Sequence, residues 1–358
     1  MRIFYASPDS PNPDFPSRLW RANLYDALVG LGHDVAAFDF DFAQTFRHLD
    51  PNDPSQQSFI LENRPRVTRE LLRQVEAAHH ARPIDLFFSY FYDACVEPGA
   101  IEQIKALGTT TINWYCNASF QLLLVREIAP HYDFCLVPEK ARLSDYRALG
   151  AKPIYCQEAA NPAVYHPCDV PLEFDVTFVG QCYADRADHV LWLLANGVDV
   201  RVWGPMWEYH VQPRTRNPLT RWFRTPTGLP PGAAGGVLSD DGLVEMYSRS
   251  KINLGFSTCG ETHRTDDRMV QIRLRDFEVP MSGGFYLVEH SEELAEFFEF
   301  GSEIETYRSR EEMLDKIRFY LSHDAARERI RWAGRTRCLR DHTWQKRFES
   351  VFKELGLS

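Results

Sequence analysis

Short apolar runs alternate with amphipathic helical patterns from one end of this chain to the other. A buried strand followed by a helix that returns the chain to the next strand is the unit from which open parallel sheets are built. This alternation therefore favours an α/β fold over an all-helical or all-strand one. The pattern predicts strands at residues 2–6, 34–38, 84–90, 110–115, 134–137, 153–155, 174–180, 198–203, 251–256 and 284–288. It predicts helices at residues 17–31, 67–75, 184–195, 310–321 and 344–355.

The length of 358 residues is large for one domain and suits two. The segment 158–167 is polar and carries two prolines, which is typical of an interdomain linker. We expect a Rossmann-like domain at residues 1–160, a second at 170–340, and a C-terminal helix at 341–358. Two such domains facing each other across a cleft is the simplest architecture for this pattern.

Composition excludes several classes of protein. The 40 Lys and Arg residues against 50 Asp and Glu give a formal net charge of −10, unlike the basic footprint of a general nucleic-acid binder. No apolar run reaches the ~18 residues of a membrane-spanning helix. The eight cysteines form no C-x-x-C pair, which favours a reducing, cytoplasmic location. His79 and His80 are adjacent and cannot face one ligand on a helix, so no metal site is expected.

Ligands of open parallel sheets bind where the strands end, beside the N-termini of the following helices. Gly180 ends the predicted strand 174–180, and Arg186 falls in the first turn of the next helix. A glycine permits close backbone approach, and an arginine there can pair with a phosphate. The segment is not G-x-G-x-x-G, so a dinucleotide fingerprint is absent. A tight turn with a surface arginine is the alternative.

A second segment, 273–287, combines charge with a glycine corner. Arg275 and Glu278 are three residues apart and so share one face of a predicted helix, which ends at Gly283-Gly284 before a buried strand. An isolated pair of this kind is usually exposed and contributes little. Here the glutamate stands between two apolar residues, near the end of a helix expected to face the cleft.

These residues resemble the nucleotide-sugar site of GT-B glycosyltransferases, and more specifically the CgeB-like (spore maturation protein-like) family. The shared patterns are the glycine and arginine at 180 and 186, the segment YSRSKINL at 247–254, and RDFE at 275–278 before the glycine corner. The likeness covers about residues 174–352. The linker sequence NPAVYHP at 161–167 also resembles the interdomain crossing of GT-B enzymes.

The resemblance implies a glycosyltransferase that moves a sugar from a nucleotide-sugar donor, with a UDP-sugar favoured, to an acceptor that the sequence does not identify. That acceptor is a glycan, a protein, a small molecule or a lipid-linked compound. No cofactor or metal is implied, because arginine, lysine and helix amides stabilise the leaving diphosphate. Glu278 would accept hydrogen bonds from the donor ribose. The implied donor-binding residues are Gly180, Arg186, Lys251, Arg275, Glu278, Gly283 and Gly284.

Two parts of the family pattern are not carried over. Many retaining GT-B enzymes have Glu-x7-Glu, but Val270 stands eight positions before Glu278, so the stereochemistry stays open. A general base would come from the first domain, and Asp93, which follows the predicted strand 84–90, is our candidate. A lone aspartate there is more often a cap or turn residue. The rival candidates for the base are Asp9, Asp14, Asn117 and His131.

The connection 209–239 has no acidic residue but holds several arginines with aromatic neighbours. It is either a solvated excursion or a flap that meets an anionic or membrane-associated acceptor. Its distinctive residues are Arg214, Arg216, Arg221, Trp222, Phe223 and Arg224.

Two other functions are compatible with this architecture. A sugar-nucleotide epimerase would need paired acid and base residues around the sugar, and the sequence does not locate them. A non-catalytic nucleotide-sugar-binding module would need only the donor-binding residues.

Overall fold

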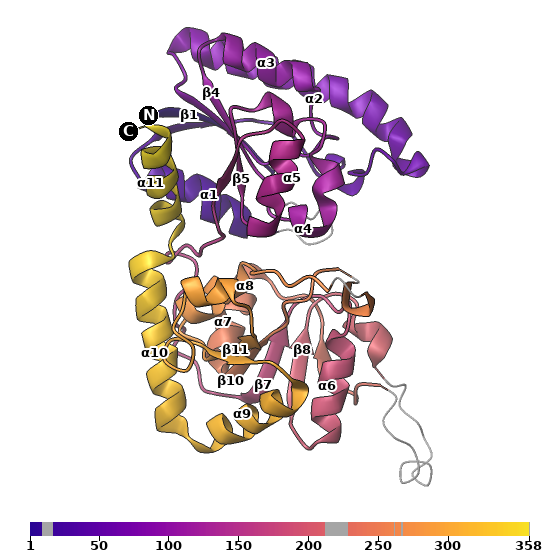
Figure 1. The fold of residues 1–358 in the computed structure, drawn as a ribbon, viewed down its shortest axis with the longest axis vertical. Helices are drawn as coiled ribbons and strands as arrows, with labels where there is room; N and C mark the ends of the chain where they lie inside the picture. The colour runs from indigo at the N-terminus through magenta and orange to yellow at the C-terminus, as the bar shows by residue number, and fades with distance from the viewer. Residues whose placement is uncertain (9–16, 212–227, 261, 266–267, 358) are drawn as a thin grey trace. The chain divides into compact units, whose positions relative to one another are not determined.

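The computed structural model of this chain describes residues 1–8, 17–211, 228–260, 262–265 and 268–357 (Figure 1). The chain forms two compact units. Unit 1 comprises Met1–Asn161 and Trp344–Ser358, and unit 2 comprises Pro162–Thr343. The C-terminal helix, which we expected as a separate element, is therefore part of unit 1.

Unit 1 is built on a six-stranded sheet with the order β2-β1-β3-β4-β5-β6, and all of its strand pairs are parallel. Each of the strands predicted for this half of the chain is present. The strands are β1 (Arg2–Ala6), β2 (Asp34–Ala37), β3 (Leu86–Ser89), β4 (Thr110–Trp114), β5 (Phe134–Val137) and β6 (Pro153–Tyr155).

The helices of unit 1 are α1 (Leu19–Gly30), α2 (Pro54–Ala81), α3 (Pro98–Ala106), α4 (Ala118–Gln121), α5 (Leu143–Ala148) and α11 (Trp344–Leu355). Helix α2 begins well before the predicted residue 67, at a start that a side-chain cap defines. The Asp53 side chain accepts a hydrogen bond from the Ser55 amide at 2.9 Å, and Pro54 occupies the first helical position. Helix α11 packs beside α1, where Trp344 and Phe348 are fully buried in the core of this unit.

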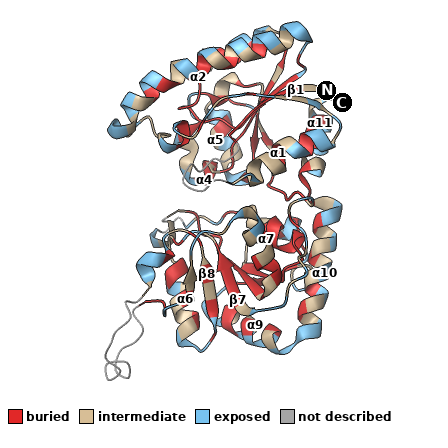
Figure 2. Cartoon of the chain, turned by 180° about the vertical axis from the view of Figure 1, so that it is seen from behind, coloured by how far each residue is buried: buried red, intermediate tan, exposed pale blue. Residues whose placement is uncertain are grey.

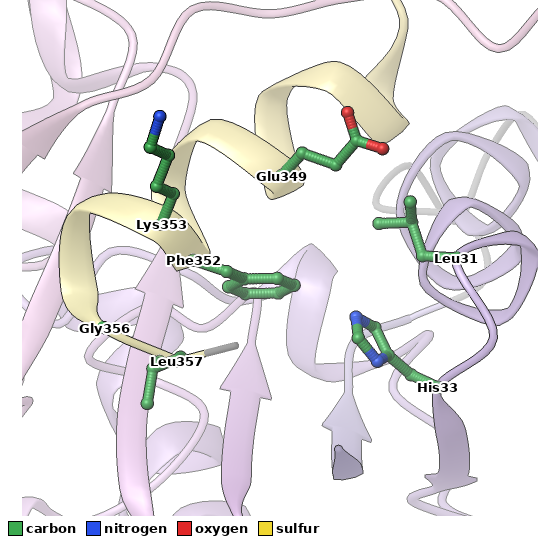
Figure 3. Close-up of a pocket in the computed structure, with 7 residues that line it drawn as sticks. All are labelled: Leu31, His33, Glu349, Phe352, Lys353, Gly356 and Leu357. Atoms are coloured by element: carbon green, nitrogen blue, oxygen red, sulfur yellow. The ribbon is translucent and has the colours of Figure 1, made fainter.

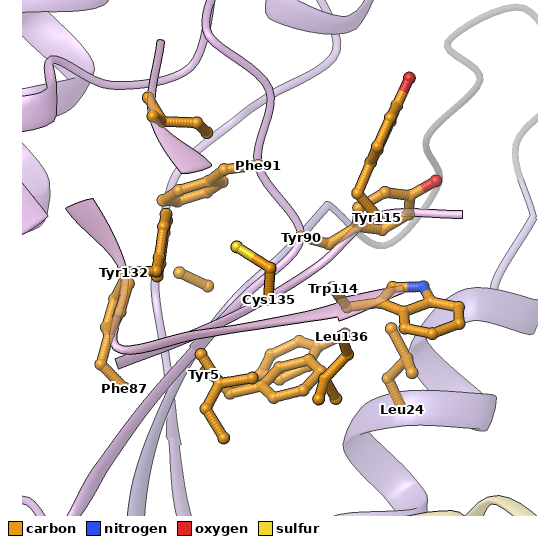
Figure 4. Close-up of a cluster of buried hydrophobic side chains, with 14 of the residues drawn as sticks. Tyr5, Leu24, Phe87, Tyr90, Phe91, Trp114, Tyr115, Tyr132, Cys135 and Leu136 are labelled. Atoms are coloured by element: carbon orange, nitrogen blue, oxygen red, sulfur yellow. The ribbon is translucent and has the colours of Figure 1, made fainter. Parts of the chain in front are cut away.

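Aromatic side chains dominate the core of unit 1 (Figure 4). Trp114 and Trp344 meet edge to face with ring centroids 5.1 Å apart. At the far end of α11, a cavity of about 390 Å³ opens between that helix and the turn that joins α1 to β2 (Figure 3). His33 and Phe352 line it in edge-to-face contact.

Unit 2 repeats the design with a second six-stranded parallel sheet in the order β12-β11-β10-β7-β8-β9. Its strands are β7 (Phe174–Val179), β8 (Val200–Trp203), β9 (Ala234–Gly235), β10 (Ser250–Gly255), β11 (Tyr286–Glu289) and β12 (Glu305–Tyr307). The two edge strands, β9 and β12, were not predicted. They have two and three residues, too few to show an apolar run.

The helices of unit 2 are α6 (Arg186–Ala195), α7 (Asp240–Arg249), α8 (Arg275–Met281), α9 (Arg310–Ser322) and α10 (Asp324–Asp341). Ser239 and Ser309 cap α7 and α9 through their side chains. The central strands are buried while the outer helix faces are exposed (Figure 2). None of the helices in the described part of the chain is long and apolar enough to cross a membrane.

Candidate functional site

The strand order of unit 2 selects one place for a ligand. From β7 the chain passes to β8 and β9 on one side and later to β10 on the other. The connections that follow β7 and β10 therefore leave in opposite directions. Such a switch point opens a crevice at the carboxyl ends of the two strands, where open α/β sheets bind their ligands.

Arg186 spans this switch point. It is the first residue of α6 and is only 3% exposed. Its guanidinium donates to the carbonyl of Gln181, at 2.8 Å, and to the hydroxyl of Tyr183, at 2.7 Å. A longer bond of 3.4 Å reaches the carbonyl of Phe256, which directly follows β10. One arginine thus ties the loop after β7 to the end of β10.

Arg273 and Arg275 bring two further guanidinium groups to the same place. The Cζ atoms of Arg186 and Arg273 lie 3.8 and 5.8 Å from the ring centre of Tyr183. Those of Arg186 and Arg275 lie 5.1 and 4.9 Å from the ring centre of Phe178. Two aromatic faces therefore hold three cations close together, as cation–π contacts allow.

The arginine cluster, Arg186, Arg273 and Arg275, brings three positive charges together beside two buried carboxylates of α8, Asp276 and Glu278. The cations outnumber the carboxylates, so an excess of positive charge remains. Burial lowers the pKa of Arg186 to about 9. The charges of Arg273 and Arg275 lower this pKa further, whereas Tyr183 raises it. The buried Nε atoms of Arg273 and Arg275 have no hydrogen-bond partner among the described residues. The cluster is suited to an anion with several oxygens.

The backbone around this cluster is unusual. Ala184 and Met206 have φ angles of 54° and 72°, the positive values that glycine normally supplies, and no other described non-glycine residue has them. The two residues lie in the loops after β7 and β8, which the bond from the Cys182 amide to the Pro205 carbonyl joins at 2.9 Å. Strain of this kind collects at binding sites.

Glu278 lies one helical turn after Arg275 on α8, as the sequence spacing predicted. The carboxylate is 6% exposed and accepts hydrogen bonds at both oxygens. Tyr165 donates to Oε1 at 2.5 Å and Tyr247 donates to Oε2 at 3.2 Å. Burial raises the pKa of Glu278, while the Tyr165 hydroxyl and the charge of Arg275 oppose the rise.

Lys251 does not lie with the other predicted donor-binding residues. It is the second residue of β10, and its Nζ pairs at 2.6 Å with Asp175, the second residue of β7. Four residues of strand, roughly 13 Å, separate it from the carboxyl end of β10. Its expected position beside the diphosphate was therefore wrong.

Gly283 and Gly284 also lie away from the arginine cluster, because they precede β11 at the amino edge of the sheet. Gly283 has a φ of +70° and ends α8, with its amide bonded to the Pro280 carbonyl at 2.9 Å. A Cβ on Gly284 would lie 2.8 Å from the side-chain nitrogen, Nδ2, of Asn253. This corner allows the helix to pack closely on the strands and does not approach the cluster.

Asp93 is a buried structural residue and not an accessible base. It is 3% exposed, and its two oxygens accept hydrogen bonds from the amides of Glu127 and Ile128, both at 3.0 Å. Burial raises its pKa to about 6, against the effect of these amides. The carboxylate holds the loop before β5, which is the capping role that the sequence left open.

The other sequence candidates contribute little to this site. Asn117 precedes α4 and makes no side-chain cap, and His131 contacts Glu102 at 3.0 Å. Asp9 and Asp14 lie outside the described residues, as does the arginine-rich part of the 209–239 connection, 212–227. The described residues bring together no three His, Cys, Asp or Glu side chains that could hold a metal ion.

Sequence reasoning missed Arg273, Tyr183 and Tyr165. Arg273 stands two residues before Arg275 in the segment already selected, so the sequence Arg-Leu-Arg could have pointed to it. Tyr165 gave none, because its contact with Glu278 joins positions 113 residues apart.

Comparison with known families supports the expected enzyme class. Residues 186–353 match the model of a family described as glycosyl transferase-like. The matched region contains the whole arginine cluster and Glu278. It confirms a glycosyltransferase as the enzyme class, while the CgeB-like subfamily stays a prediction. Comparison with curated proteins found no match.

Several solved structures share the fold at low sequence identity. A sucrose-phosphate synthase from Thermosynechococcus elongatus has a TM-score of 0.63 at 12% identity, with 99% of each chain covered. Anabaena Alr3699/HepE in complex with UDP-glucose has a TM-score of 0.60 at 10% identity, also with 99% of each chain covered. AviGT4, a glycosyltransferase of avilamycin A biosynthesis, has a TM-score of 0.57 at 16% identity, covering 99% of this chain and 96% of its own. The chain thus has the GT-B fold of two parallel six-stranded sheets, and its residues 186–353 are glycosyltransferase-like.

Proposed function

We propose that this protein transfers a sugar from a nucleotide-sugar donor, with a UDP-sugar favoured, to a separate acceptor, and that it does so without a metal ion. The observation that carries the proposal is the arginine cluster at the switch point of unit 2. Three guanidinium groups, which outnumber the two carboxylates of α8 beside them, would form a site for a dianionic diphosphate.

The same groups give the site its chemistry. As the bond between the sugar and the diphosphate breaks, negative charge grows on the leaving phosphate oxygens. Arg186, Arg273 and Arg275 are already in place to stabilise that charge, so no reorganisation accompanies the reaction. Because these fixed cations can do the work of a divalent ion, we propose that no metal or other cofactor takes part.

Glu278 supports a nucleotide as the carrier of the diphosphate. Its carboxylate lies one helical turn from Arg275, and each oxygen keeps acceptor capacity beyond its tyrosine partner. A ribose diol can donate to such a carboxylate. Uridine is proposed as the base because a neighbour of the same fold was solved with UDP-glucose.

Titration calorimetry with UDP, GDP, ADP and dTDP in the presence of EDTA tests the donor site. We expect one nucleotide, UDP, to bind wild type without metal and to bind Arg275→Gln at least tenfold more weakly, since hydrogen bonds to charged groups contribute about 1.5–3 kcal/mol. Equal binding to both proteins, or a strict requirement for a divalent ion, would contradict the proposal.

Turnover then separates the candidate functions. With the UDP-sugar and no acceptor, we expect slow release of UDP and free sugar. Formation of an epimeric UDP-sugar would instead identify an epimerase, and tight binding with no turnover would identify a binding module. The acceptor class, whether glycan, protein, small molecule or lipid-linked, would follow from screening each class against the established donor.

A cytoplasmic location is part of the proposal. All eight cysteines lie in the described ranges as thiols outside any disulfide, and seven of them are buried. Thiols that persist in this form are typical of a reducing compartment.

A further inference from the structure

The carboxylate proposed to bind the ribose belongs to a buried group of three side chains. Tyr165, Tyr247 and Glu278 are respectively 0%, 1% and 6% exposed. The hydroxyl of Tyr165 donates to one carboxylate oxygen and that of Tyr247 to the other. The two donors come from different parts of the chain, one from the end of α7 and the other from the segment just after unit 1.

Tyr165 belongs to that crossing segment. Asn161 is the last residue of unit 1, where its amide donates to the Asn23 side chain at 3.0 Å and its own side chain donates to the Ala22 carbonyl at 2.6 Å. Only residues 162–164 separate this anchor from Tyr165, which is fixed to Glu278. The segment that joins the units is thus bonded directly to the candidate ribose ligand.

We infer that Tyr165 is a positioning residue for the donor: its hydroxyl holds the Glu278 carboxylate in one orientation, in which the remaining lone pairs of its oxygens accept the ribose hydroxyls. The inference rests on the proposed function, and it assigns part of the donor site to the crossing segment.

The physical reason lies in the burial of Glu278. A buried carboxylate stays charged only when hydrogen-bond donors compensate for the lost water. Each hydroxyl that donates to the carboxylate occupies one of its lone pairs, and the remaining lone pairs stay available to a ligand. Without the Tyr165 hydroxyl, Oε1 loses this donor, and the carboxylate is less strongly held in its charged form and in its present rotamer. The contact with the ribose, but not with the diphosphate, would weaken.

The test compares ribose and deoxyribose nucleotides. The dissociation constants of UDP and 2′-deoxy-UDP are measured for wild type and Tyr165→Phe, together with the GDP and ADP pairs. We expect wild type to prefer the ribonucleotide by about tenfold, the usual effect of losing one hydrogen bond to a charged group. In Tyr165→Phe the preference should fall to about twofold or less, with the affinity for 2′-deoxy-UDP nearly unchanged.

Tyr286, the first residue of β11, offers a matched control, because its partner lies on the same helix as Glu278. Tyr286 is 2% exposed and donates to Asp276 at 2.6 Å, so Tyr286→Phe also removes a buried hydroxyl from a carboxylate of α8. It should lower the melting temperature without changing the ribose preference. Replacing Tyr165 by 4-aminophenylalanine keeps the ring and a weaker donor, and it should give an intermediate preference even if Tyr165→Phe does not fold.

Four results would overturn the inference. In Tyr165→Phe, equal weakening of both nucleotides would show that the hydroxyl is merely structural, and an increased preference would show that it competes with the ribose. A wild type that binds UDP and 2′-deoxy-UDP equally would remove the ribose role of Glu278 while leaving the diphosphate site intact. A wild type that binds no nucleoside diphosphate would overturn the proposed function and this inference together.

Discussion

The guanidinium of Arg275 lies against the α-carbon of Gly180, in the space that a side chain at that glycine would need. A Cβ there would overlap the Nη2 atom of Arg275 and would lie 2.9 Å from the ring of Phe178. The glycine itself cannot move away, because its amide and carbonyl are bonded at 2.7 Å to Trp203 and Trp207. The end of β7 therefore determines where the cation of α8 can lie.

Gly180→Ala should displace Arg275 and weaken nucleotide binding. We expect a loss of tenfold or more in affinity, because the displaced guanidinium no longer meets the diphosphate. The measurement is the dissociation constant of the nucleotide, with circular dichroism to verify folding. Gly236→Ala is the control in the same unit, since a Cβ at Gly236 meets no atom within 4 Å. Equal affinities for the two variants would show that this contact does not matter.

Arg273 should contribute to binding through charge. Arg273→Gln removes one of three clustered cations, and we expect a tenfold weaker affinity and a shallower dependence of binding on salt. Arg201→Gln is the matched control, because Arg201 lies on β8 of the same sheet and is already paired with Asp199 at 2.9 Å. If both variants lose the same affinity, the effect is one of net charge and not of the cluster.

The sequence predicts most of the fold but only part of the site. Strands with an apolar run were found within two residues of their ends, since burial of the central strands leaves that pattern in the sequence. Glu278 and Arg275 were predicted together because helical spacing places them on one face. Lys251 was misplaced because the family resemblance alone put it in the donor site, although it stands at the amino end of the predicted strand 251–256, where it pairs with Asp175. Tyr165 depends on a contact between distant segments, which no local pattern encodes.

Lys251→Met tests this correction. The lysine pairs with Asp175 at the amino edge of the sheet, and both side chains are about one-third exposed or more. We expect an unchanged affinity for the nucleotide and a loss of at most about 1 kcal/mol in stability, the usual range for partly exposed ion pairs. Calorimetry and urea unfolding of the same preparation give both values. A tenfold loss of affinity would return Lys251 to the donor site.

Asp93 should make the stability of unit 1 depend on pH in a defined direction. Burial raises its pKa from 3.8 to about 6, so the folded protein binds this proton more tightly than the unfolded chain does. Between about pH 4 and pH 6 the unfolded state has lost the proton while the folded state keeps it, and the free energy of unfolding falls as pH rises through this window. A shift of this size corresponds to about 3 kcal/mol.

Asp93→Asn removes the ionisation and leaves only one oxygen for the amides of Glu127 and Ile128. The variant should be less stable than wild type near pH 4, because one buried amide loses its acceptor. This difference in stability should become smaller as the pH approaches 7, because wild type then carries a buried charge at Asp93 that destabilises its folded state. Glu139, whose pKa burial raises to about 7, acts in the same direction in both proteins, so only the difference between the two curves reports on Asp93. Urea unfolding at several pH values measures that difference. Parallel curves would mean that Asp93 ionises as readily in the folded protein as in the unfolded chain.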